Sequence, residues 1–213
     1  MKSRLVLACA LILGLAGCTL LPERQPSDVY RLPTALPDST PASLSPQETP
    51  WSLRVLRPSS SSQTAGRRII VIPEDQRVSI YAGSAWTDPA PSLMRQRILD
   101  AVRADGRVPH ISSGRHGLHA EFELDSDLRA FHSEYRNGLA HAVIRLDARL
   151  VDTESRRILA SRSFSTHRAS SDNEVASVVQ AFGTAADRIG VEIADWIITQ
   201  GNALADEKGP ASR

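Results

Sequence analysis

Two long stretches of this 213-residue sequence alternate between apolar and polar side chains, and they constrain the fold more than any other feature. Over residues 118–130, and again over residues 140–150, nearly every even-numbered residue is apolar. Successive side chains of a strand point to opposite faces, so each stretch predicts a strand with one face in a core. Its other face lies in water or against a partner. We expect a third strand over residues 158–164.

The pairing of the two long strands follows from the same numbering. Directly opposed residues must share a face, so the numbers in each pair should sum to an even value. Asn137-Gly138 is typical of a two-residue hairpin turn, but that turn would pair Arg136 with Leu139, an odd sum. We therefore expect an odd-length loop or a bulge at this point.

Shorter strands should precede this hairpin. Trp51, Leu53 and Val55 share one face of an alternating segment, and Pro58 ends it. The expected strands cover residues 51–57, 68–72 and 77–81, and the expected loops cover residues 59–66 and 83–91.

Two helices are expected. The first has Asp88 as its N-cap and runs to about Asp105, where Gly106 stops it. The second follows a capping box of Ser171 and Glu174 and extends for about 25 residues. Residues 201–213 are expected to be a frayed tail. The apolar residues that mark the buried faces are Met94, Ile98, Ala101 and Val102 in the first helix, and Val175, Val178, Val179, Phe182, Ala185, Ala186, Ile189, Ile193, Trp196 and Ile197 in the second.

These elements predict an α+β fold, with two layers and two helices on one face of a mixed or mostly antiparallel sheet. Residues 51–200 are enough for one domain with a sizeable core. The preceding residues 18–50 are rich in proline and form a tether, in which residues 29–32 could add a short edge strand.

The amino terminus has the pattern of a secretory signal peptide. Lys2 and Arg4 precede an apolar run over residues 5–16, which is too short to span a membrane. The run ends in Leu15-Ala16-Gly17-Cys18, which resembles a bacterial lipobox. We expect residues 1–17 to be removed and the Cys18 thiolate to carry fatty acyl chains such as palmitate, which tether the protein to a membrane. The alternative is ordinary secretion with a chance cysteine.

Charge and cysteine content argue against a nucleic-acid-binding protein and against a disulfide-stabilised one. The chain has 25 basic and 24 acidic side chains, and removing Lys2 and Arg4 with the signal leaves a net charge of −1. Nucleic-acid-binding proteins usually carry an excess of basic residues, which this chain lacks. Cys9 lies in the signal, so Cys18 is the one cysteine of the processed chain and no disulfide forms within it.

The sequence offers no strong catalytic or metal-binding pattern. His116 and His119 are three apart, which places them on opposite faces of a strand. We therefore expect no metal, no cofactor and no catalytic residue. A row of carboxylates could do acid–base chemistry, but a solvated face opposite Arg145 and Arg149 is the favoured interpretation. The row is formed by Glu121, Glu123, Asp125 and Asp127.

Two aromatic residues are candidates for partner binding. Tyr81 and Trp86 flank a Gly-Ser-Ala loop. They either form an exposed anchor for a partner or cover the core, and the sequence leaves both alternatives open. Trp196 is expected in the core.

Taken in order, several features resemble the ABC-type transport auxiliary lipoproteins over about residues 18–200. Thr87 departs from the small residue usual after Trp86 in that family. The features are the lipobox, a tether with Tyr30-Arg31-Leu32, Leu53-Arg54-Val55, residues 69–72, Tyr81-x₄-Trp86-x₂-Pro89, residues 125–131, a strand ending in Leu150-Val151-Asp152, Ile158-Leu159-Ala160-x₃-Phe164 and a last helix with Trp196.

The resemblance implies a non-enzymatic accessory subunit of an envelope transporter that moves phospholipids or similar amphiphiles. Such lipoproteins are periplasmic and dock onto an MCE-domain protein that works with an ABC ATPase. In enteric-type bacteria an Asp after the lipidated cysteine favours the inner membrane, so Thr19 points to the outer membrane. A homo-oligomer is compatible with the sequence. Two alternatives stay open: a lipoprotein that regulates or assembles another envelope machine, such as a cell-wall synthase, and a direct lipid carrier.

Overall fold

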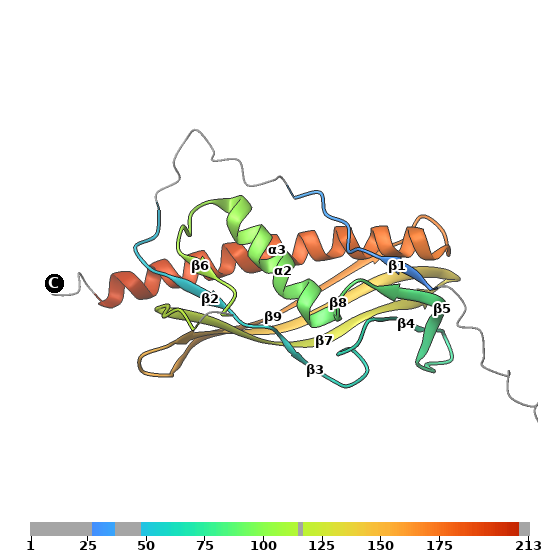
Figure 1. Cartoon of the computed structure of the whole chain (residues 1–213), viewed down its shortest axis with the longest axis horizontal. Coiled ribbons are helices and arrows are strands. Elements are labelled where there is room, and N and C mark those ends of the chain that lie inside the picture. Colours follow the sequence, from blue (N-terminus) through green and yellow to red (C-terminus); the bar gives the residue numbers. More distant parts are fainter. Residues whose placement is uncertain (1–26, 37–47, 115–116, 209–213) are drawn as a thin grey trace, which may run out of the picture.

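The computed structural model describes residues 27–36, 48–114 and 117–208. Within these ranges a nine-stranded mixed sheet is covered on one face by two helices (Figure 1). The fold is therefore α+β, as predicted. We call the helix-covered face the inner face and the opposite one the outer face. The elements are β1 (Asp28–Tyr30), β2 (Leu53–Val55), β3 (Ser59–Ser60), β4 (Arg68–Ile72), β5 (Ser79–Trp86), α2 (Ala90–Asp105), β6 (Ile111–Ser112), β7 (Phe122–Arg136), β8 (Leu139–Asp152), β9 (Ile158–Ala169) and α3 (Val175–Lys208).

Most of the sheet is built around β7. It pairs with β8 in an antiparallel ladder along its whole length, and β8 pairs in the same sense with β9. The shorter β2, β3 and β4 run parallel to β7. Beyond β4 the order continues through antiparallel β5 to parallel β1, a short edge strand close to the predicted residues 29–32.

The register of the long hairpin contains the bulge that the numbering required, but at a different place. Arg136 pairs with Leu139, so Asn137 and Gly138 do form a two-residue turn. The ladder instead shifts between Leu128 and Ala130. The β7 residues that face the helices are consequently even-numbered before the bulge, as Leu128 is, and odd-numbered after it, as Phe131 and Ser133 are.

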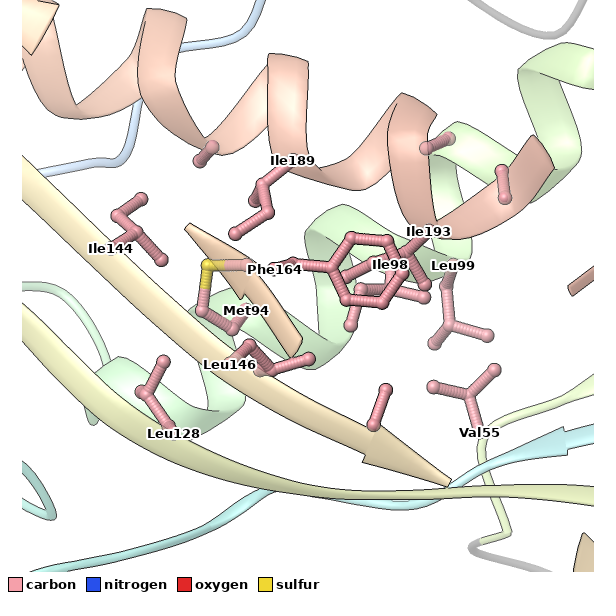
Figure 2. Close-up of a cluster of buried hydrophobic side chains, with 14 of the residues drawn as sticks. Val55, Met94, Ile98, Leu99, Leu128, Ile144, Leu146, Phe164, Ile189 and Ile193 are labelled. Atoms are coloured by element: carbon pink, nitrogen blue, oxygen red, sulfur yellow. The ribbon is translucent and has the colours of Figure 1, made fainter. Parts of the chain in front are cut away.

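The core fills the space between the inner face and the helices. Figure 2 shows Ile189 and Ile193 of α3 above Ile144 and Leu146 of β8, with Met94 of α2 beside them. These side chains are buried, as the alternation of β8 and the helical spacing predicted.

Both helices differ from the predicted boundaries at one end. Pro89, not Asp88, takes the N-cap position of α2, without a side-chain hydrogen bond, while Gly106 ends the helix in the left-handed conformation as expected. Before α3 the predicted capping box is also wrong, because Asp172 accepts the hydrogen bond from the Glu174 N–H (2.9 Å). The helix then continues to Lys208, so residues 201–208 are not a frayed tail.

Two predicted loops contain strands. The polar segment at residues 59–66 begins with β3, whose two residues pair with β7. The segment at residues 83–91 begins as the second half of β5, which starts at Ser79 and extends to Trp86. Its partners β4 and β1 explain this, because local breakers in a sequence are overridden when backbone groups find a neighbouring strand.

The segment after β1, residues 31–36, is clamped onto the helices, and we call it the strap. Arg97 of α2 donates to the carbonyl oxygens of Leu32 (3.3 Å) and Pro33, and to the Asp187 carboxylate of α3. Asp187 also accepts the N–H of Ala35 (2.8 Å). A buried charge needs such compensation, and Arg97 is only 4% exposed. The strap therefore fixes the path by which the chain enters the domain.

Candidate docking surface at the hairpin end

Two turns meet at one end of the sheet, which we call the hairpin end. They are the β7–β8 turn at Asn137 and Gly138 and the β4–β5 turn over residues 73–78. The Gly138 N–H donates to Glu74 across them (3.4 Å). Asn137 and Gly138 have φ angles of 53° and 75°, as a primed two-residue turn requires. Asn173, just before α3, donates to the Gly138 carbonyl oxygen (2.9 Å), so the helix also begins at this end.

An open groove lies on the inner face at the hairpin end. Val71 pairs with both Ser79 and Ser133, which puts the three side chains on one face of β4, β5 and β7. The groove has a volume of about 620 Å³. Apolar rings and aliphatic groups form much of its wall, and Glu74 and Asp75 stand at its rim. The lining residues are Val71, Pro73, Glu74, Asp75, Ser79, Tyr81, Tyr135 and Gly138.

Tyr81, one of the two predicted partner-binding residues, is part of this groove. Its ring is half-buried, and its hydroxyl shares a hydrogen bond of 3.2 Å with the Ser133 hydroxyl. Burial raises the pKa of Tyr81, although the bond to Ser133 opposes the rise. Tyr81 thus offers a neutral ring of fixed orientation to anything that enters the groove, which keeps it a candidate for partner binding.

Trp86 does not fit the hypothesis of an exposed anchor. Its side chain is 0% exposed and makes edge contacts with Phe131 and Phe182 at centroid distances of 5.7 and 5.3 Å. It covers the core, which was the alternative. Tyr81 and Trp86 are five residues apart and would face opposite ways in a regular strand. Gly83, with a φ angle of 66°, breaks the alternation and lets both rings face inward.

A basic cluster occupies the outer face at the same end. Glu134 is its one carboxylate. It accepts hydrogen bonds from His132 (2.8 Å) and Arg136 (2.9 Å), and Arg145 lies 3.9 Å away. The register places these side chains and those of His141 and His167 on one face. We call this set the outer-face cluster; its members are His132, Glu134, Arg136, His141, Arg145 and His167.

The electrostatics of the outer-face cluster favour a net positive surface. Burial acts to raise the pKa of Glu134, but hydrogen bonds from His132 and Arg136 outweigh it and lower the pKa. Glu134 is therefore ionised at neutral pH. Burial and the neighbouring Arg136 and Arg145 lower the pKa of His167. The two guanidinium groups exceed the single carboxylate, so the cluster carries a surplus positive charge.

The predicted row of carboxylates forms separate polar pairs along β7. Glu121 accepts the N–H of Ser52 (2.7 Å), and Glu123 pairs with Arg54 (2.6 Å). The next two, Asp125 and Asp127, both pair with Arg149 (2.9 and 2.8 Å), as expected from the cross-strand arrangement. Arg145 instead approaches Glu134, because the bulge shifts the register before that point. Every carboxylate of the row has a donor, with Arg149 shared by two of them, which is the solvated arrangement favoured by the sequence.

The remaining predicted site residues do not come together. Cys18 and His116 lie outside the described residues, and His119 is exposed. Across the described ranges no group of three or more His, Cys, Asp or Glu side chains could hold a metal ion. In the same ranges no helix has the length and apolar character needed to cross a membrane.

Comparison with known proteins decides the family. Residues 30–194 match the ABC-type transport auxiliary lipoprotein component family. The chain belongs to this family. This confirms the resemblance found in the sequence, and the match to the auxiliary lipoproteins includes the whole hairpin end.

Solved structures agree with the assignment. The crystal structure of a Xanthomonas campestris protein of the family DUF330 is 28% identical to this auxiliary lipoprotein, with a TM-score of 0.74, and the match covers 83% of this chain and 98% of that one. The crystal structure of an uncharacterized protein has the same fold, with a TM-score of 0.63 at 15% identity over 81% of this chain and 99% of that one. An uncharacterized protein of Bradyrhizobium diazoefficiens is 27% identical over 162 residues. That match covers 75% of this chain but only 43% of the relative.

Proposed function

We propose that this auxiliary lipoprotein is a non-enzymatic docking subunit of an envelope transporter that moves phospholipids or similar amphiphiles. Its partners in this proposal are an MCE-domain protein and the ABC components. Family membership is the observation that carries the proposal. The carboxylates of β7, all of which are held by donors, support a binding role over a catalytic one.

The proposal includes an anchor at Cys18 in the periplasmic leaflet of the outer membrane. Several acyl chains, each contributing about 0.8 kcal/mol per buried CH₂, would hold the protein stably on a bilayer. Metabolic labelling with a palmitate analogue tests this directly. Cys18→Ala should abolish incorporation of the label, and equal labelling of the variant would contradict the anchor.

The groove around Tyr81 is the proposed contact for the transporter. Its apolar wall with acidic residues at the rim suits a protruding apolar side chain of a partner, flanked by polar or basic groups. Tyr81 is the aromatic residue most suited to act as a hot spot there, because its ring is held by Ser133 before a partner arrives.

Purification from detergent-solubilised envelopes tests the docking role. The wild-type chain should recover the MCE and ABC components in stoichiometric amounts. Tyr81→Ala should recover much less, while Ile158→Ala, an exposed apolar residue at the opposite end, should behave as wild type. Stoichiometric recovery of a cell-wall synthase without any transporter component would contradict the proposal.

A further inference from the structure

The outer face at the hairpin end combines two features that point to a lipid surface. Val29, Val78 and Ile80 are large apolar side chains with exposures of 53, 50 and 44%. Ile80 pairs with Ile70 and Val29 with Ala85, so both lie on the outer face of the β1–β5 edge. The outer-face cluster, with its surplus of guanidinium groups, belongs to the same face and end. Exposed aliphatic groups beside basic ones are typical of surfaces that rest at the headgroup and acyl boundary of a bilayer.

The direction in which the chain enters the domain gives the second argument. β1 runs parallel to β5, whose first residue Ser79 lies at the hairpin end, so Asp28 is the residue of β1 nearer to that end (Figure 1). Asp28 is ten positions after Cys18, a length of chain that reaches at most about 35 Å, whereas β7 alone is about 50 Å long. The strap, held by Arg97 and Asp187, prevents this entry point from swinging away. A lipid on Cys18 is therefore joined to the domain on the side where β1 begins, which favours contact between the hairpin end and the membrane.

We propose that the outer face at the hairpin end rests on an anionic phospholipid bilayer, with Ile80 inserted at the level of the acyl boundary and Arg136 and Arg145 beside lipid phosphates. This inference rests on the proposed anchoring at Cys18. The inner-face groove with Tyr81 stays open to the transporter in this orientation, because it lies on the other side of the same strands. At the hairpin end, the domain would then contact a bilayer with its outer face and a protein partner with its inner face.

Depth-dependent fluorescence quenching tests the orientation. The processed, lipidated chain has no free thiol once Cys18 is acylated, so a single bimane label can be placed with Ile80→Cys, Ile158→Cys or Val191→Cys. All three positions are exposed aliphatic residues, at 44, 59 and 45%, which makes the last two matched controls. Each labelled chain is reconstituted in vesicles of phosphatidylethanolamine and phosphatidylglycerol with or without spin-labelled lipid. Thermal melts check that each variant is folded.

The proposal predicts strong quenching at position 80 and weak quenching at positions 158 and 191. The double variant Arg136→Glu and Arg145→Glu should reduce lipid quenching at position 80 about fivefold or more. Each basic residue near an anionic surface adds to the attraction between protein and membrane. High salt and vesicles of phosphatidylcholine alone should have the same effect.

Three results would overturn the proposal, and they separate its failure from that of the anchor. Equal or stronger quenching at positions 158 or 191, in chains that float with the vesicles, would refute the orientation while leaving the anchor intact. Contact between labels at position 80 of two copies, without quenching by lipid, would show that a second copy covers this face. Chains that fail to float with the vesicles would refute the anchor and, with it, the orientation.

Discussion

The two ends of the sheet are built differently. At the end opposite the hairpin, which we call the closed end, Trp51 is 2% exposed, stands edge-on to Phe122 at 5.4 Å and donates from its indole N–H to Asn202 (3.0 Å). Gly201 lies directly against the Trp51 ring. Single aliphatic side chains are exposed at both ends, Ile158 at the closed end and Val78 and Ile80 at the hairpin end. The hairpin end, however, also leaves an apolar groove open. The comparison indicates that the closed end supplies stability, whereas the hairpin end forgoes some burial and leaves apolar surface for other molecules.

The largest expected loss of stability comes from opening the closed end. Trp51→Ala should lower the free energy of unfolding by about 3 to 5 kcal/mol, because it removes a buried indole and leaves a cavity. At the hairpin end, Ile80→Ala should change it by at most about 0.5 kcal/mol, since the side chain is already exposed. Denaturant unfolding of the two variants measures both. Similar losses for the two would remove the distinction between the ends.

The strap is held on both helices by Arg97 and Asp187, and this ion pair should be nearly as costly to break. Asp187→Ala should destabilise the domain by about 3 kcal/mol, because Arg97 would remain buried without its carboxylate. The control is the double variant Arg97→Met with Asp187→Leu, which removes both charges and should lose clearly less than the single one. Denaturant unfolding compares the two, and a larger loss for the double variant would contradict this account of the strap.

Glycine substitutions at the two ends should cause smaller losses of stability, which can also be compared. A Cβ at Gly201 would come within 2.4 Å of the Trp51 ring, so Gly201→Ala should cost about 2 to 3 kcal/mol by overpacking. Gly138 has open space around it and a positive φ angle of 75°, so Gly138→Ala should cost about 1 to 2 kcal/mol from backbone strain alone. Thermal melts rank the two variants, and the reverse order would show that the closed end tolerates rearrangement.

The smallest expected effect is a pH dependence at the closed end, where Arg107 joins Asp105 of α2 to Asp195 of α3. Hydrogen bonds from Arg107 lower the pKa of Asp105 below its ordinary value. Asp105 therefore binds a proton more readily in the unfolded chain than in the folded one. The ionised Asp105 stabilises the fold fully above about pH 4, and this stabilisation is lost as the pH falls through the lowered pKa. Asp105→Asn should reduce stability by at most about 1 kcal/mol at neutral pH and less in acid. Urea unfolding from pH 3 to 7 should show the two curves converging at low pH, and a constant gap would contradict this assignment.

The sequence could predict those parts of the fold that are governed by local periodicity. The alternation of β8 and the spacing of α3 place Ile144, Leu146, Ile189 and Ile193 in the core, where the structure has them. The odd pair sum at the turn required a bulge, but the position of that bulge depends on contacts across strands. For the same reason the sequence did not predict that β5 continues through Gly83 or that α3 continues beyond Gly201. A glycine is expected to end a strand or helix unless the contacts of the surrounding elements are known.

The candidate site was harder to predict for a related reason. Tyr81 was found from its loop, but the groove around it requires β4, β5 and β7 to be side by side. The outer-face cluster draws on three strands, and no spacing in the sequence joins His167 to Arg136. Arg97 left a signal that could have been used: it interrupts the buried face of α2 between Met94 and Ile98. A charge in such a place usually has a partner, here Asp187.

Photo-crosslinking in intact envelopes tests most directly whether the hairpin end is the working surface. A photoreactive phenylalanine derivative replaces Tyr81 at the hairpin end or, in a matched chain, Ile158 at the closed end. The account predicts adducts with MCE or ABC transporter components from position 81 and none from position 158. Adducts with those components from position 158 alone would contradict it.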